Sequence, residues 1–203
     1  MNKADQCRCS WCGEDPLYRD YHDNEWGVPV FDEQRLFEML ILEGAQAGLS
    51  WITVLRKREN YRKAFNNFDI QKMARFTPEK IEKLMLDPGI IRNRLKIESA
   101  IKNARALLTM KKNGEDFSHF LWSFVNHAPI QHKLRGMQDA VGSTPESDAM
   151  SKALKKKGFN FVGSTICYAF MQACGMVNDH IVDCYRHREC AALARLQPQL
   201  NIP

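Results

Sequence analysis

Apolar side chains recur at helical spacing along most of the chain, and this pattern limits the possible folds more than any other feature. After Asp32, the residues Leu36, Phe37, Leu40 and Ile41 follow one another three and four positions apart. Such spacing is typical of a helix that begins at a capping aspartate and buries one face. No segment alternates apolar and polar residues convincingly enough to predict a strand. We therefore expect an all-α protein built from many short helices.

Further helix boundaries can be placed by their end signals. Ser50 is a candidate cap for a helix that continues to about Phe65. Thr77 and Thr144 each precede a Pro–Glu pair, which is typical of a first helical turn. The helix that follows Thr144 should end at Gly158, because glycine readily adopts the conformation that terminates a helix.

Length and composition indicate one ordinary globular domain. The chain has 203 residues, of which 44% are hydrophobic and 26% are charged, and no apolar run approaches the length of a membrane span. The N-terminal stretch lacks the apolar segment of a secretory signal, so we expect a cytoplasmic protein with reduced thiols and no membrane partner. No feature requires an oligomer, and a monomer is the expected state.

Cysteine and histidine residues near both ends of the chain suggest a metal site. His180 and Cys184 are four residues apart and share one helical face, so they offer half of a tetrahedral site. An isolated pair of this kind is more often a buried histidine and a buried thiol. The N-terminal segment favours the metal site over ordinary burial, because it supplies candidate partners for the pair. These candidates are Cys7, Cys9, Cys12 and His22, and Cys9 and Cys12 could also bind a metal by themselves.

A short turn between two helices suggests contact with a phosphate backbone. The first helix should end at Asp87, Pro88 and Gly89 should form a tight turn, and an amphipathic helix should follow at once. In such a helix-hairpin-helix pattern, backbone N–H groups and the next helix N-terminus can hold a phosphate. The neighbouring basic residues Arg92, Arg94 and Lys96 would add positive charge. An ordinary helical turn with solvated basic residues is an equally good explanation of the residues alone.

One carboxylate lies on the apolar face of its helix. Glu43 follows Leu36 and Leu40 at helical spacing, so it should be buried and should need a partner. Aromatic residues are frequent in the N-terminal part of the chain, and they could surround it as a pocket for a flat group that stacks and donates hydrogen bonds. A core position for the rings and an internal ion pair for Glu43 are the alternatives. The aromatic candidates are Trp11, Tyr18, Tyr21, Trp26 and Trp51.

Several blocks of the sequence together resemble the constitutive bacterial DNA-3-methyladenine glycosylase I family. The blocks include DPLYRDYHDNEWGVP, AGLSWITVL, LWSFVNH, SKALKKKGFNFVG and ICYAFMQACG, and they cover nearly the whole chain from Cys9 to Cys184. The resemblance implies a helix-hairpin-helix glycosylase fold, formed here by residues 1–184 as one domain. It also implies a structural zinc ion that joins the N- and C-terminal segments. Residues 185–203 have no counterpart in this resemblance, and their role is unknown.

The resemblance also implies roles for individual residues. It selects Cys9, His22, His180 and Cys184 as the zinc ligands. Glu43 and Tyr21 would hydrogen-bond the excised base, Trp11 and Trp51 would stack on it, and Tyr18 and Trp26 would help to line the pocket. The turn that contains Gly48 and Leu49 would enter the gap left by a flipped nucleotide, with Leu49 as the wedge. Gly89, Arg92, Arg94 and Lys96 would then contact phosphates.

Together, these implications predict a DNA repair enzyme that acts in base excision repair. It would excise 3-methyladenine from alkylated double-stranded DNA, release the free base and leave an abasic site without cutting the strand. The positively charged base leaves as a neutral molecule, so it needs no protonation, and Glu43 is the main candidate for electrostatic assistance. Glu43 would have to be partnered strongly enough to stay ionised. Two alternatives are a non-enzymatic zinc-stabilised DNA-binding module and a zinc hydrolase with an open metal site.

Overall fold

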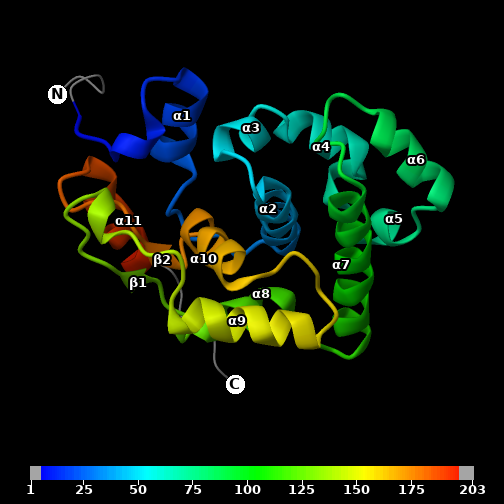
Figure 1. Ribbon diagram of the computed structural model, residues 1–203. Coiled ribbons are helices and arrows are strands. Elements are labelled where there is room, and N and C mark those ends of the chain that lie inside the picture. The colour runs from blue at the N-terminus through cyan, green and yellow to red at the C-terminus, as the bar shows by residue number, and fades with distance from the viewer. Residues whose placement is uncertain (1–5, 197–203) are drawn as a thin grey trace.

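Helices form most of the protein in the computed structural model, which describes residues 6–196 (Figure 1). The prediction of a mostly helical protein is therefore confirmed. The α-helices are α1 (Pro16–Asn24), α2 (Glu33–Gln46), α3 (Trp51–Leu55), α4 (Arg58–Ala64), α5 (Ile70–Ala74), α6 (Pro78–Leu86), α7 (Arg94–Lys112), α8 (Phe117–Trp122), α9 (Pro145–Lys156), α10 (Ser164–Ala173) and α11 (Tyr185–Leu196). Short 3-10 turns occur at Ser10–Cys12, Asn66–Phe68, Ser123–Val125 and Met137–Asp139.

Two short strands show that the prediction of a strand-free chain was wrong. Strand β1 (Ile130–Gln131) pairs in parallel with β2 (Val177–Asn178). Alternation of apolar and polar residues cannot be recognised over two positions, so the sequence gives no sign of either strand. The pairing fixes the backbone immediately before His180.

The predicted helix starts agree with the structure. The side chains of Asp32, Thr77 and Thr144 accept hydrogen bonds from backbone N–H groups in the first turns of α2, α6 and α9, respectively. Gly158 follows the end of α9 with a φ of +92°, as expected for a glycine that terminates a helix.

The single helix predicted from Ser50 to Phe65 is instead two helices, α3 and α4. The Ser50 hydroxyl lies 2.8 Å from the Thr53 hydroxyl and makes no hydrogen bond to the backbone of α3. The chain then changes direction, and Arg58 at the start of α4 forms an ion pair with Glu25, with 2.6 Å between nitrogen and oxygen. This ion pair joins the start of α4 to the residue that follows α1.

Helix α2 lies at the centre of the molecule and packs against α3, α7, α8 and α10 (Figure 1). Every residue from Leu36 to Ala45 is buried, including the carboxyl-bearing Glu38 and Glu43. Residues 87–93 join helices α6 and α7, so the second helix begins at Arg94 and not immediately after Gly89 as predicted.

The N-terminal segment and the C-terminal part of the chain lie side by side at one edge of the molecule (Figure 1). The backbone N–H of Tyr185 donates to the carbonyl oxygen of Cys7 at 3.1 Å. The segment from residue 185, to which the sequence assigns no role, begins with α11, and this helix packs against β2. Residues 197–203 of that segment lie outside the described residues. None of the described helices is both long enough and apolar enough to span a membrane.

Candidate active site and metal centre

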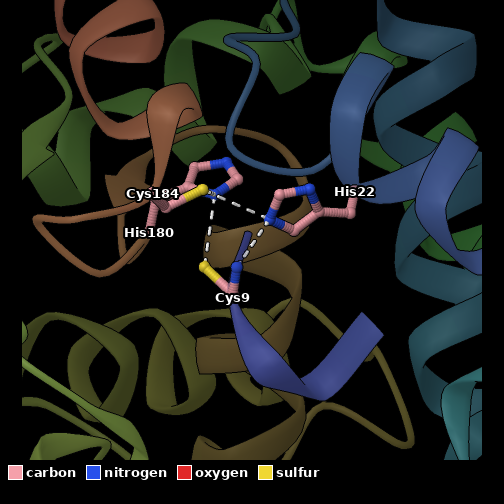
Figure 2. A group of neighbouring side chains, drawn as sticks. All are labelled: Cys9, His22, His180 and Cys184. Carbon is pink, nitrogen blue, oxygen red and sulfur yellow. Dashed lines mark hydrogen bonds between the residues drawn. The ribbon is translucent and has the colours of Figure 1, made fainter. Parts of the chain in front are cut away.

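Four side chains from the two ends of the chain meet in one buried cluster (Figure 2). They are Cys9, His22, His180 and Cys184, and their ligand atoms all lie within 4.8 Å of one another. Cys9 Sγ is 3.5 Å from His180 Nδ1, and Cys184 Sγ is 3.5 Å from His22 Nε2 and 3.6 Å from His180 Nδ1. Tetrahedral zinc bonds of about 2.3 Å to sulfur and about 2.0 Å to nitrogen separate these two donors by about 3.5 Å. The three sulfur–nitrogen distances therefore match those expected around a zinc ion.

Hydrogen bonds on the outer side of both imidazoles determine which nitrogen faces the cluster. His22 Nδ1 is 2.8 Å from Asp23 Oδ1, and His180 Nε2 is 3.0 Å from the carbonyl oxygen of Trp26. These oxygens accept hydrogen bonds, so each nitrogen beside them carries a proton and the opposite nitrogen keeps a lone pair for a metal. Burial raises the pKa of Asp23, but hydrogen bonds from Arg8 and His22 outweigh it and lower this pKa to about 2.

The two thiols also fit a bound cation. The hydrogen bond with Cys184, followed by burial, raises the pKa of Cys9, whereas the hydrogen bond from Cys9 lowers the pKa of Cys184 to about 2. A divalent metal ion would stabilise both side chains as thiolates. Protein atoms would occupy all four tetrahedral positions. This arrangement is typical of a structural site and disfavours the zinc hydrolase alternative.

The remaining N-terminal cysteines lie outside the cluster. Cys12 is buried, but its Sγ lies 3.1 Å from the carbonyl oxygen of Cys9 as a hydrogen-bond donor. Cys7 is exposed. The structure therefore brings together the ligand set implied by the family resemblance and not a Cys9–Cys12 pair.

A cavity of 210 Å³ lies directly beside the metal cluster, and Cys9 belongs to both. Aromatic rings form much of its wall and contact one another edge to face, with Trp11 centred 5.0 Å from Tyr18 and 4.9 Å from Trp26. The ring of Tyr21 is 5.3 Å from that of Trp51. All of the aromatic residues predicted from the sequence line this cavity, namely Trp11, Tyr18, Tyr21, Trp26 and Trp51.

Polar atoms in the cavity wall lack partners. Among the described residues, no hydrogen bond reaches Oε2 of Glu43 or Nε1 of Trp11 and Trp51, although all three atoms are buried. Buried polar groups are normally paired, so unpaired groups that line a cavity indicate a ligand that both donates and accepts hydrogen bonds. All three of these residues line the cavity.

Glu43 lacks the internal partner that would keep its carboxyl group ionised. It is 4% exposed, and burial raises its pKa to about 8. Burial also raises the pKa of Tyr21, with a further contribution from the nearby Glu43. The condition that internal partners keep Glu43 ionised is therefore not met: Oε2 has no hydrogen-bond partner among the described residues, and burial favours the neutral carboxyl group.

A further part of the cavity wall was not predicted from the sequence. It is formed by the segment after β1, by α10 and by residues around β2. Asp179 lies in this wall, and its carboxylate accepts hydrogen bonds from Tyr168 and Gln172 at 2.6 and 2.7 Å. The sequence offered one sign of this wall, the polar residue Asp179 directly before His180. The wall comprises Leu134, Gly136, Met137, Ala140, Ala169, Gln172, Asp179 and Ile181.

A tight turn connects the end of α2 to α3 beside the cavity. The N–H of Leu49 donates to the carbonyl oxygen of Gln46 at 2.6 Å, and Gly48 has a φ of +78°. A type II turn requires a positive φ at its third position, which explains a glycine there. The Leu49 side chain is 42% exposed although it is apolar. Residues 46–49 therefore present an apolar tip within six residues of Glu43.

The predicted phosphate contacts have unequal environments. Arg92 is exposed, whereas Arg94 forms an ion pair with Glu82 at 2.8 Å. The N–H of Gly89 is not free, because it donates to Asp87 Oδ1 at 2.7 Å. The Lys96 ammonium donates to the carbonyl oxygens of Ala45 and Ala47, at 2.8 and 2.6 Å. Lys96 therefore contacts the end of α2, a partner that charge pattern alone does not reveal.

Comparison with known proteins agrees with the geometry of the pocket. Residues 11–187 match the family model described as methyladenine glycosylase. The chain is 60% identical over 177 residues to DNA-3-methyladenine glycosylase 1 of Escherichia coli K12, which covers 87% of this chain and 95% of the relative.

Solved structures agree in fold. A crystal structure of 3-methyladenine DNA glycosylase I has a TM-score of 0.87 at 57% identity, covering 88% of this chain and 98% of the other. A variant of 3-methyladenine DNA glycosylase I in complex with 3-methyladenine has a TM-score of 0.84 at 36% identity, covering 88% and 96%.

Proposed function

The chain belongs to the methyladenine glycosylase family, and from this premise we propose that it excises 3-methyladenine from alkylated double-stranded DNA. The observation that carries the proposal is the unpaired Glu43 carboxyl group inside an aromatic cavity. A bare DNA-binding module has no use for such a cavity, so it explains the structure less well.

The cavity suits a flat, positively charged base. Stacking on an aromatic side chain contributes roughly 1 to 3 kcal/mol per base, and a cationic ring adds a cation–π attraction. Trp11 and Trp51 provide stacking surfaces, and Tyr21 adds a hydrogen bond to the base. Glu43 accepts a hydrogen bond from the exocyclic amine.

The charge of the lesion changes the state of Glu43. Burial raises the pKa of Glu43 to about 8, so the pocket without a cation favours the neutral carboxyl group. A cationic base in contact with the carboxyl group favours the ionised form, so Glu43 releases its proton as the lesion enters. Normal adenine is neutral and provides no such compensation, which is a source of discrimination against undamaged DNA.

The reaction is a hydrolysis. The bond between the base nitrogen and C1′ of the sugar breaks, its electron pair neutralises the cationic base, and water adds to C1′ and gives up a proton. No lysine lines the cavity as the structure describes it, so no amine is placed to form a Schiff base with the sugar. The product is an abasic site in an uncut strand.

The rest of the site delivers the base to this cavity. A base inside a duplex is not accessible, so the nucleotide rotates out, at a cost of a few kcal/mol. Leu49 at the turn of residues 46–49 fills the space left in the duplex. The hairpin of residues 87–93 and the exposed Arg92 contact phosphates. Zinc held by Cys9, His22, His180 and Cys184 has a structural role beside the cavity.

Release of free base from alkylated duplex DNA tests this proposal. The wild-type protein should release 3-methyladenine, resolved by chromatography, and the strand should break only after alkaline treatment. The Glu43→Gln variant should be folded but should bind free 3-methyladenine more weakly and excise it more slowly. Absence of release by folded, zinc-loaded wild-type protein would refute the proposal, and normal excision by Glu43→Gln would refute the role of Glu43.

A further inference from the structure

Lys96 connects two parts of the molecule that the proposed function uses separately. It is the third residue of α7, the helix that follows the hairpin of residues 87–93. Its ammonium group is half-buried and donates to the carbonyl oxygens of Ala45 and Ala47, at 2.8 and 2.6 Å. Two of its three N–H donors are therefore committed to the end of α2.

The position of these carbonyl groups explains why a cation lies there. The last carbonyl oxygens of a helix have no partner within the helix, and they form the negative end of its dipole. Ala45 is in the last turn of α2, and Ala47 is the residue that caps it. Lys96 thus stabilises the end of α2 at the point where the turn of residues 46–49 begins. Glu43 lies less than one helical turn before this point.

The hairpin also contacts α4 and the residue before it. Lys57 Nζ donates to the carbonyl oxygen of Pro88 at 2.7 Å, and the N–H of Ile91 donates to the hydroxyl of Tyr61 at 3.2 Å. These contacts join the hairpin to Lys57 and to α4, and the chain continues from the hairpin directly into α7. Lys96, in the first turn of α7, then joins the same unit to the turn that carries Leu49.

We propose that Lys96 is a positioning residue that couples the hairpin to the turn of residues 46–49, so that a phosphate contact at the hairpin sets Leu49 for base extrusion. The inference rests on the proposed glycosylase function and assigns Lys96 a role other than a phosphate contact. Lysine suits the position because a flexible stem carries its compact charge to two carbonyl oxygens at once.

Three variants test this role. Lys96→Met removes the charge but keeps the apolar stem, Lys96→Arg keeps a cationic donor, and Lys102→Met is a matched control at an exposed position of the same helix. For each variant, we would measure single-turnover excision from alkylated duplex DNA, binding of free 3-methyladenine, and the salt dependence of binding to undamaged duplex.

Lys96→Met should slow single-turnover excision roughly 10- to 100-fold, the range expected for a displacement of about 1 Å in a catalytic geometry. Lys96→Arg should recover most of the rate, and Lys102→Met should match the wild type. Binding of free 3-methyladenine should change less than about twofold, since the cavity itself is intact. The slope of log affinity against log salt should stay unchanged, whereas loss of a phosphate contact would reduce it by about one.

Other results would overturn the assignment. A reduced salt slope in Lys96→Met would identify Lys96 as a phosphate contact. Wild-type excision by Lys96→Met would remove the coupling role, and a parallel loss of free-base binding would show a general structural role instead. Absence of excision by the wild type would overturn the proposed function together with this inference, so the two failures are distinguishable.

Discussion

The buried carboxyl group of Glu43 should make the free energy of unfolding depend on pH in an unusual direction. An ordinary glutamate loses its proton near pH 4.5, whereas burial raises the pKa of Glu43 in the folded protein to about 8. Between these values, the folded state binds more protons than the unfolded state. Stability therefore falls as the pH rises from about 4.5 to about 8, and the loss is complete above about pH 8.

The size of this effect follows from the difference between the two pKa values. The shift from 4.5 to about 8 corresponds to at most about 5 kcal/mol, because each pKa unit is about 1.4 kcal/mol. Glu43→Gln removes the titration and keeps the shape of the side chain. The variant should therefore gain stability relative to the wild type as the pH rises, by up to about 5 kcal/mol at pH 8.5.

Urea unfolding between pH 5 and pH 8.5, with zinc present throughout, measures this difference. Glu38→Gln is the matched control, because Glu38 is also buried on α2 but is paired with Arg62 at 2.7 Å. That substitution breaks an ion pair and should destabilise the protein without a gain that grows with pH. A difference between wild type and Glu43→Gln that stays constant from pH 5 to pH 8.5 would refute the argument.

Two further predictions concern the metal cluster and the turn of residues 46–49. Cys184→Ser should abolish stoichiometric zinc binding, measured by elemental analysis, and should weaken binding of free 3-methyladenine because Cys9 belongs to both cluster and cavity. Cys12→Ser should retain zinc. Zinc retained by Cys184→Ser and lost by Cys12→Ser would refute the ligand assignment. Gly48→Ala and Gly114→Ala each place a Cβ in open space at a positive φ (+78° and +77°), so each should cost about 1 to 2 kcal/mol of stability in urea unfolding. Only Gly48→Ala should also slow excision, and equal rates for the two variants would exclude a role for the turn.

The features that follow from local spacing were predictable from the sequence. The capping residues Asp32, Thr77 and Thr144 act as expected, because a side chain and the N–H groups it caps are close in sequence. The burial of Glu43 followed from its position relative to Leu36 and Leu40. The metal cluster could be assembled from residues at both ends only because the family resemblance selected Cys9 among three N-terminal cysteines.

The features that depend on contacts between distant segments were not predictable. The wall that contains Asp179 and Met137 comes from segments with no recognisable motif, and two-residue strands leave no pattern. The partners of Lys96 were also not predictable, because its charge is equally compatible with a phosphate and with the end of a helix. Only the packing of α7 beside α2 identifies its carbonyl partners.

The juxtaposition of the two ends of the chain has a consequence for the order of events during synthesis. Cys9 and His180 are 171 positions apart, and the cavity takes walls from residues near both of them. Helices near the N-terminus can form while the ribosome is still translating, but contacts of such long sequence separation form late. The aromatic cavity and the Cys9, His22, His180 and Cys184 cluster are therefore completed together, after translation has passed Cys184. A chain interrupted before that point would contain most of the helices but could not recognise a damaged base.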